Sequence, residues 1–214
     1  MTQVLPVSAF AFGLAGLSLA GLPPIDRDEV LFAQSSRQML QSGDYVDIRF
    51  ADAPRYKKPV GIYWAQAAVV ESASKLGLQR AQVRIWLYRV PSLIGAIGAV
   101  LLTYWTALAF VTRRGALLAG LLMCSSILLG VEARLAKTDA MLLLTTTAVM
   151  GAMARAYLSW QRGDDNPHPS WKLAFVFWTA MAGGILLKGP LILMFVALTV
   201  VTLAILDRSA AWLW

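Results

Sequence analysis

The chain has 214 residues, of which 58% are hydrophobic and only 14% are charged, and its mean hydropathy is +0.61. A soluble domain typically carries about a quarter charged residues, so this composition indicates a membrane protein. It excludes a disordered chain and a soluble nucleic-acid-binding domain, and the one cysteine excludes a disulfide scaffold. The formal net charge of +7 then favours contact with membrane lipids and phosphates, and no nucleic acid partner is expected.

Six apolar stretches approach or reach the length of about 20 helical residues that crosses a bilayer. They are Val4–Leu22, Val90–Val111, Ala116–Val131, Ala140–Leu158, Leu173–Leu187 and Leu191–Leu206. The first has no Lys or Arg ahead of it and no cleavage-site pattern, so we expect a retained anchor. The last two together exceed one crossing and are interrupted by Lys188-Gly189-Pro190, which predicts a hairpin.

One long polar region, residues 23–89, separates the first two stretches. Asp26–Leu40 is predicted to be an amphipathic helix, because its apolar side chains fall on one helical face, and Ser42-Gly43-Asp44 ends it. Tyr45–Tyr56 is expected to be extended or looped, and Gly61–Gly77 is expected to form a second, largely apolar helix. Two short helices joined by a basic loop are typical of a segment that lies on the membrane surface.

The predicted fold class is therefore all-α, a polytopic membrane helical bundle of about six spans. We expect one transmembrane domain over residues 1–214, with a first span at 4–22, the membrane-surface helical loop at 23–89 and five further spans in 90–206.

Counting crossings places the loops on alternating sides of the membrane. The 23–89 loop, the turn before the fourth stretch and the turn between the last two stretches then share one side, which gathers carboxylates and cations there. These residues are Asp28, Glu29, Lys57, Lys58, Arg134, Lys137, Asp139 and Lys188. The 23–89 loop carries ten Lys and Arg, but the positive-inside rule holds only for loops of up to about 60 residues, so orientation stays open on physical grounds.

Six short motifs contain these residues and follow one another along the chain. They are P-I-D-R-D-E (Pro24–Glu29), Q-M-L-Q-S-G-D-Y-V (Gln38–Val46), Y-K-K-P-V-G-I-Y-W (Tyr56–Trp64), R-V-P-S (Arg89–Ser92), A-R-L-A-K-T-D-A-M-L (Ala133–Leu142) and L-L-K-G-P (Leu186–Pro190). In this order and spacing they resemble the amino-terminal part of bacterial GT-C integral-membrane glycosyltransferases. The nearest groups are the aminoarabinose lipid A transferases and the protein mannosyltransferases.

The resemblance implies a membrane enzyme that transfers a sugar from a polyprenyl-phosphate carrier to a lipid, glycan or protein acceptor. It also implies a multi-pass protein of the bacterial inner membrane whose active face is periplasmic. Members of the family are usually more than twice as long, so we expect this chain to be a fragment or a truncated paralogue.

The resemblance also implies roles for single residues. Asp28 matches the catalytic carboxylate of the family's Asp-Glu pair, with Glu29 as its neighbour, and Asp139 matches a second acidic position. Lys58 matches the lysine beside the donor phosphate. Arg134 and Lys188 are added as donor-phosphate-binding residues, because they lie at span ends on the same side and a lysine beside a glycine turn suits phosphate.

Each of these residues also has a purely structural interpretation. Asp26 and Glu29 could form a capping box at the start of a helix, and Lys58 could be a lysine that snorkels to the membrane surface. Arg134 and Asp139 could serve as an ion pair or a helix cap at a span end, and Lys188 as an interfacial anchor.

Two departures from the family pattern concern the donor and a metal. Leu31 stands where many relatives have arginine, and Lys57 stands where aminoarabinose transferases have a metal-binding glutamate. We therefore expect no metal ligand at Lys57, and the sequence leaves a need for a divalent cation open. Two rival hypotheses remain, a non-catalytic truncated paralogue and a transporter or lipid-binding membrane protein. A transporter would carry ionisable residues in the middle of its spans.

Overall fold

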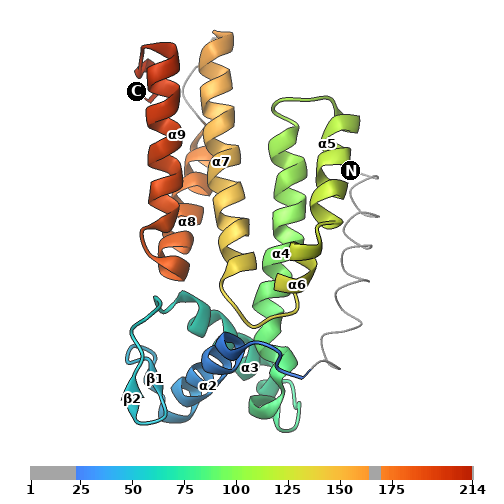
Figure 1. The fold of residues 1–214 in the computed structure, drawn as a ribbon, viewed down its shortest axis with the longest axis vertical. Coiled ribbons are helices and arrows are strands. Elements are labelled where there is room, and N and C mark those ends of the chain that lie inside the picture. The colour runs from blue at the N-terminus through green and yellow to red at the C-terminus, as the bar shows by residue number, and fades with distance from the viewer. Residues whose placement is uncertain (1–22, 164–169, 214) are drawn as a thin grey trace.

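The computed structural model describes residues 23–163 and 170–213, so the predicted first span, Val4–Leu22, lies outside the described residues. The helices of the described part are α2 (Arg27–Ser42), α3 (Gly61–Lys75), α4 (Ile85–Ala107), α5 (Arg113–Cys124), α6 (Ile127–Glu132), α7 (Asp139–Arg162), α8 (Trp171–Lys188) and α9 (Leu191–Asp207). Shorter elements are the strands β1 (Arg49–Phe50) and β2 (Ala53–Pro54) and the 3-10 turns η1 (Ala81–Val83) and η2 (Ala211–Leu213). Figure 1 shows α2, α3 and the small hairpin as a layer across one end of the longer helices.

Helices α2 and α3 confirm the two helices predicted in the polar region. Asp26 is the N-cap of α2 and accepts a hydrogen bond from the backbone N–H of Asp28 at 2.7 Å. Gly43 ends the helix with φ +72°, a left-handed conformation that glycine adopts without strain. Between α2 and α3, β1 and β2 pair as an antiparallel hairpin in the segment expected to be extended or looped.

The apolar helices form an all-α membrane bundle, as predicted. In the described part, α4, α7 and α8 are long and apolar enough to cross a membrane, and α9 is a shorter apolar helix. Helices α8 and α9 form the predicted hairpin, because Gly189 ends α8 with φ +66° and its N–H donates to the carbonyl of Ile185 at 2.8 Å. Proline follows directly, as is common just after a helix end.

The third predicted span, Ala116–Val131, is wrong as a continuous helix. Helix α5 ends at Cys124. Ser126 then caps a new helix, α6, by accepting a hydrogen bond from the N–H of Leu129 at 3.4 Å. Serine hydroxyls compete with the helical backbone for hydrogen bonds, which explains the break. Helix α4 also begins at Ile85, five residues before the predicted span, so part of the expected loop belongs to the bundle.

The layer of α2 and α3 is fixed to the bundle by two buried clusters. Phe32 of α2 and Tyr63 of α3, whose ring centroids are 5.5 Å apart, pack with Leu187 at the end of α8. Val70 of α3 packs with Tyr88 of α4 in the second cluster. Between the two helices of the layer, the Ser36 hydroxyl donates to Gln66 Oε1 at 2.7 Å. The layer therefore holds a fixed position over the ends of α4, α7 and α8.

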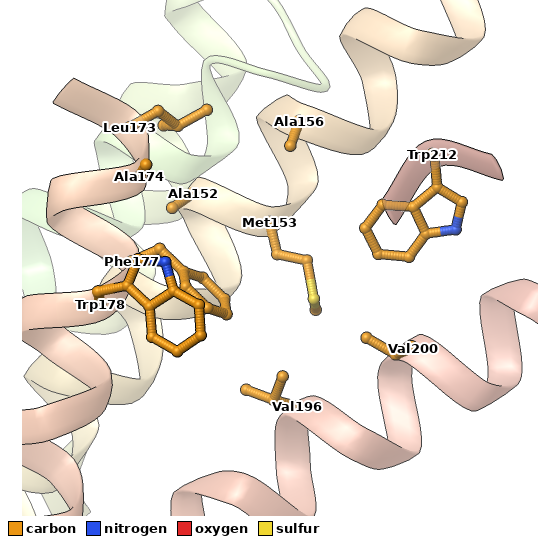
Figure 2. Close-up of a pocket in the computed structure, with 10 residues that line it drawn as sticks. All are labelled: Ala152, Met153, Ala156, Leu173, Ala174, Phe177, Trp178, Val196, Val200 and Trp212. Carbon is orange, nitrogen blue, oxygen red and sulfur yellow. The ribbon is translucent and has the colours of Figure 1, made fainter. Parts of the chain in front are cut away.

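An apolar cavity of about 360 Å³ lies at the other end of the bundle, between α7, α8, α9 and η2. Figure 2 shows its walls, which include Met153, Phe177, Trp178 and Trp212. The ten residues that line it are apolar or aromatic and none is charged, so this cavity offers no acid, base or cation for catalysis.

Candidate functional site

Charged side chains converge where the α2–α3 layer meets the bundle. Three segments far apart in sequence come together there: the start of α2, the loop 133–138 before α7, and the turn between α8 and α9 (Figure 1). Ion pairs and hydrogen bonds of side chains join the start of α2 to the loop 133–138 and to α4, and the start of α7 to the end of α8.

A buried ion pair between Glu29 and Arg89 lies at the base of this region. Arg89 Nε donates to Glu29 Oε1 at 2.6 Å and Arg89 Nη2 donates to Oε2 at 3.2 Å, and both side chains are fully buried. Glu29 Oε1 also accepts from the backbone N–H of Ala136 at 3.1 Å, and Oε2 from that of Ile25 at 3.4 Å. Glu29 thus binds α2 to α4 and to the loop before α7.

This position bears on two expectations for Glu29. Its carboxylate is enclosed and accepts hydrogen bonds from Arg89 and from the Ala136 N–H, which favours a positioning role over contact with a substrate. It does not complete a capping box with Asp26, because it reaches the N–H of Ile25 instead. A positioning role for Glu29 fits both observations.

Ser92 fixes the same loop from α4. The Ser92 hydroxyl donates to the carbonyl of Lys137 at 3.0 Å and accepts from the Lys137 N–H at 3.3 Å. Arg89 and Ser92 are three residues apart, so both face the loop from one side of α4. The R-V-P-S motif therefore holds the A-R-L-A-K-T-D segment in place.

Asp26 and Lys137 form a second ion pair, between the start of α2 and this loop. The hydrogen bond from Lys137, followed by that from the N–H of Asp28, lowers the pKa of Asp26 below its ordinary value of 3.8. Burial of Lys137 opposes its charge, but the hydrogen bond to Asp26 and the nearby carboxylates outweigh it and raise the pKa of Lys137 above 10.5. Both shifts favour the charged pair.

Acid should break the Asp26–Lys137 pair and reduce stability. Because the pKa of Asp26 is lower in the folded state, its stabilising contribution is complete above about pH 4 and is lost as the pH falls through the folded value. Asp26→Asn keeps a capping side chain but removes the charge. Thermal unfolding of wild type and Asp26→Asn from pH 7 to pH 3 should give curves that converge toward the acid end.

Asp52→Asn is the control for this pH series, because the exposed Asp52 carboxylate makes no hydrogen bond or ion pair within the described residues. Its thermal stability should follow wild type at every pH. Parallel curves for wild type and Asp26→Asn would contradict the assigned pair.

Asp139 and Lys188 form a third ion pair, which joins the first residue of α7 to the last residue of α8. Both charges suit the helix dipoles, since a carboxylate lies at an N-terminus and an ammonium at a C-terminus. Beside them, Glu132 ends α6 with a buried Oε2 that has no hydrogen-bond partner in the described part of the chain. Burial, and then the nearby Asp139, raise the pKa of Glu132.

The K-K-P-V-G segment lies against the turn between α8 and α9. A Cβ added at Gly61 would lie 2.7 Å from the carbonyl oxygen of Leu186, a distance that real Cβ atoms do not show. Only glycine therefore allows this approach, which brings Lys58 to the end of α8 that carries Lys188. Lys58 is half-buried and makes no hydrogen bond or ion pair within the described residues.

Asp28 lies exposed in the first turn of α2, with no hydrogen bond or ion pair to its carboxylate among the residues described. It contributes electrostatically to the environment of Tyr63 and Lys137. Arg55 lies over the ring of Phe32, 5.7 Å from its centroid, and opposes the burial that raises the pKa of Tyr63. The Asp28 carboxylate is thus open to solvent and has cations near it.

Arg134 differs from the other predicted residues in where it points. Its Nη1 donates to the carbonyl of Gly130 at 2.9 Å, one turn back in α6. This nitrogen therefore faces α6, and a phosphate-binding role for Arg134 stays a prediction.

Sequence reasoning did not select Arg55, Glu132 or Arg89 as site residues. Arg55 has no local pattern that could have revealed it. Arg89 and Glu132 lie in or next to the motifs, and an ionisable residue beside an apolar span was the available signal.

The residues present do not fit a metal at the position where aminoarabinose transferases place a glutamate. Lys57 is exposed there, and its ammonium would repel a cation. Among the described residues, no group of three or more His, Cys, Asp and Glu could hold a metal ion.

Comparisons with known proteins find a similar sequence and a similar fold. The undecaprenyl phosphate-alpha-4-amino-4-deoxy-L-arabinose arabinosyl transferase of Pectobacterium carotovorum subsp. carotovorum (strain PC1) is 32% identical over 124 residues, which is 58% of this chain and 21% of that protein. Crystal structures of ArnT from Cupriavidus metallidurans, apo and bound to undecaprenyl phosphate, share the fold with TM-scores of 0.81 and 0.80 at 23% identity. They match 97% of this chain, which spans 36% of theirs.

A family model agrees over most of the chain. The model for dolichyl-phosphate-mannose-protein mannosyltransferases matches residues 27–211, which include every predicted site residue. The chain therefore belongs to the dolichyl-phosphate-mannose-protein mannosyltransferase family of membrane proteins.

Proposed function

We propose that this chain forms the donor-binding part of a glycosyltransferase in the bacterial inner membrane, one that takes a sugar from a polyprenyl-phosphate carrier. The relative from Pectobacterium is named for such a donor, and ArnT from Cupriavidus metallidurans binds undecaprenyl phosphate. The acceptor is a lipid, glycan or protein, and the active face is periplasmic.

One observation carries the proposal. Within the described residues, six charged side chains of the region form ion pairs: Glu29 with Arg89, Asp26 with Lys137 and Asp139 with Lys188. The Asp28 carboxylate and the Lys58 ammonium are not paired with protein groups. A general base and a phosphate-binding cation both need to be available to the substrate, and charged groups without a protein partner meet this requirement.

These two groups supply what glycosyl transfer requires. As the acceptor nucleophile bonds to the anomeric carbon, its proton passes to the Asp28 carboxylate. The bond from the anomeric carbon to the phosphate oxygen breaks, and its electron pair leaves with the polyprenyl phosphate. The phosphate gains one negative charge in this step, which Lys58 stabilises, with Lys188 close by on α8.

The paired residues act as positioning groups. Glu29 and Arg89 hold the start of α2, and with it Asp28, against the loop before α7. Asp139 accepts a hydrogen bond from the Lys188 ammonium and so fixes its orientation. The transporter hypothesis receives less support, because Arg155, which lies within α7, donates to the carbonyls of Trp105 and Gly151 and stacks on the Trp105 ring. That arginine is therefore engaged in helix packing.

Transfer from a radiolabelled polyprenyl-phosphate sugar, with the purified chain in lipid vesicles, tests the proposal. Asp28→Asn should reduce the transfer rate by a factor of about 10² to 10⁴, the usual contribution of a general base. Asp52→Asn, which removes an equally exposed carboxylate from the hairpin, should leave the rate unchanged.

Donor binding is measured in the same preparation. Lys58→Ala should weaken polyprenyl-phosphate binding about tenfold or more, as expected for a lost charge-assisted contact, whereas Lys57→Ala, its exposed neighbour, should not. Binding without transfer would identify a truncated, non-catalytic relative that keeps the donor site. A chain with neither transfer nor Lys58-dependent binding would overturn the proposal.

A further inference from the structure

A second recess, of about 310 Å³, lies between α2, η1 and the start of α4. Its walls include Val30, Gln34 and Arg37 from α2, Val83 from η1, and Ile85 and Tyr88 from α4. Among its lining residues, Arg37 is the one that carries a charge, and no carboxylate is present.

This groove is separate from the candidate catalytic site. Arg37 follows Asp28 by nine residues in α2, which is two and a half turns at about 3.6 residues per turn. The two side chains therefore leave the helix on opposite sides and are about 14 Å apart along its axis. A ligand in the groove would not occupy the site beside Asp28.

Arg37 has unused hydrogen-bonding capacity. Its Nε is buried and has no hydrogen-bond partner, and no ion pair involves its guanidinium within the described residues. A guanidinium is a strong, fork-shaped donor for phosphate oxygens. The amide of Gln34, one turn earlier on the same face, lies in the same wall.

Apart from Arg37 and the two amides of Gln34 and Gln82, the lining of the groove is largely apolar, and two of its valines are exposed. Val30 is 46% exposed and Val83 is 57% exposed. A single cation beside two exposed valines matches a ligand that combines an anionic group with a hydrocarbon chain. An inorganic anion would leave the apolar part uncovered.

The groove is built in part from the first turns of a helix that could cross the membrane. Ile85 and Tyr88 belong to the first turns of α4, which is long and apolar enough to cross the bilayer. Lipid phosphates lie at the ends of such spans, next to the hydrocarbon. We propose that this groove binds the phosphate of an anionic phospholipid through Arg37, with an acyl chain along Val30 and Val83.

Native mass spectrometry of the purified chain in a neutral detergent, titrated with short-chain phosphatidylglycerol, tests this site. Wild type should bind one phosphatidylglycerol with an affinity that Arg37→Gln lowers about tenfold, the effect expected for a lost charge-assisted hydrogen bond. Arg27→Gln is the matched control, because Arg27 is exposed on the same helix and has no partner in the described chain. It should change the affinity less than about twofold.

Several outcomes would overturn the assignment. The assignment is wrong if wild type binds no phosphatidylglycerol. It is also wrong if Arg37→Gln and Arg27→Gln lower the affinity equally, because the binding would then depend on general surface charge. If inorganic phosphate competes as well as the lipid at equal concentration, the proposed contact of the groove with an acyl chain is wrong. If Arg37→Gln does not fold, Val83→Asp places a negative charge on the exposed wall instead, and unchanged lipid affinity in that variant would equally reject the site.

Discussion

Glu29→Gln is expected to destabilise the protein by about 3–5 kcal/mol, the usual cost of removing one partner from a buried ion pair. Arg89 would keep its charge in a fully buried position and lose the carboxylate that neutralises it. The hydrogen bond that holds the N–H of Ala136 would weaken as well. Equilibrium unfolding of the purified protein should report this loss, and donor binding should weaken because Asp28 and the loop before α7 move.

Two further variants distinguish the loss of a buried ion pair from a general effect of replacing glutamate by glutamine. Glu71→Gln breaks the exposed Glu71–Lys75 pair on α3 and should leave unfolding unchanged, since exposed pairs contribute little. Glu29→Gln combined with Arg89→Met removes both charges and should recover part of the lost stability. A single Glu29→Gln variant as stable as wild type would contradict the buried ion pair.

Gly95→Ala should be among the most damaging single-methyl additions in the bundle. A Cβ at Gly95 would lie 2.7 Å from the carbonyl carbon of Ala140 and 2.7 Å from the nitrogen of Met141. Both are backbone atoms of α7, so no side chain can move aside and α4 must separate from α7. Overpacking of this kind costs about 1–3 kcal/mol or more, and thermal unfolding in detergent measures it.

Gly183→Ala is the matched control on α8. Its added Cβ would meet Thr145 Cγ2 at 3.5 Å, an ordinary contact, and alanine favours a helix over glycine by up to about 1 kcal/mol. This variant should be neutral or slightly stabilised. If both alanine variants unfold at the same temperature as wild type, the close approach of α4 and α7 is not what sets stability.

Local signals in the sequence predicted the ends of α2 and the turn between α8 and α9. Asp26 and Gly43 bracket α2 as expected, and Gly189 and Pro190 separate α8 from α9. These signals depend on backbone groups within a few residues, so they need no knowledge of the fold. The break between α5 and α6 was missed because an apolar run does not reveal that Ser126 will cap a new helix.

The sequence also predicted that the charged residues share one side of the membrane. Counting apolar stretches placed the start of α2, the loop before α7 and the end of α8 together, and side-chain contacts join all three regions in the structure. The alternation of loops between the two sides of the membrane follows from the order of the spans alone. It gives no distances, and so it could not tell a paired carboxylate from an available one.

The all-α membrane class, the ends of α2, the turn between α8 and α9 and the shared side of the motif residues could therefore be predicted from the sequence, because periodicity, capping and the order of spans are local or sequential properties. Which charged side chains form ion pairs and which stay available to a substrate depends on the tertiary structure. Glu29 meets Arg89 across 60 residues and Asp26 meets Lys137 across 111, and no local rule governs contacts of that span. Packing of α2 onto α4 and the loop before α7 buries Glu29 and leaves Asp28, the preceding residue of the helix, about 100° away and open to solvent.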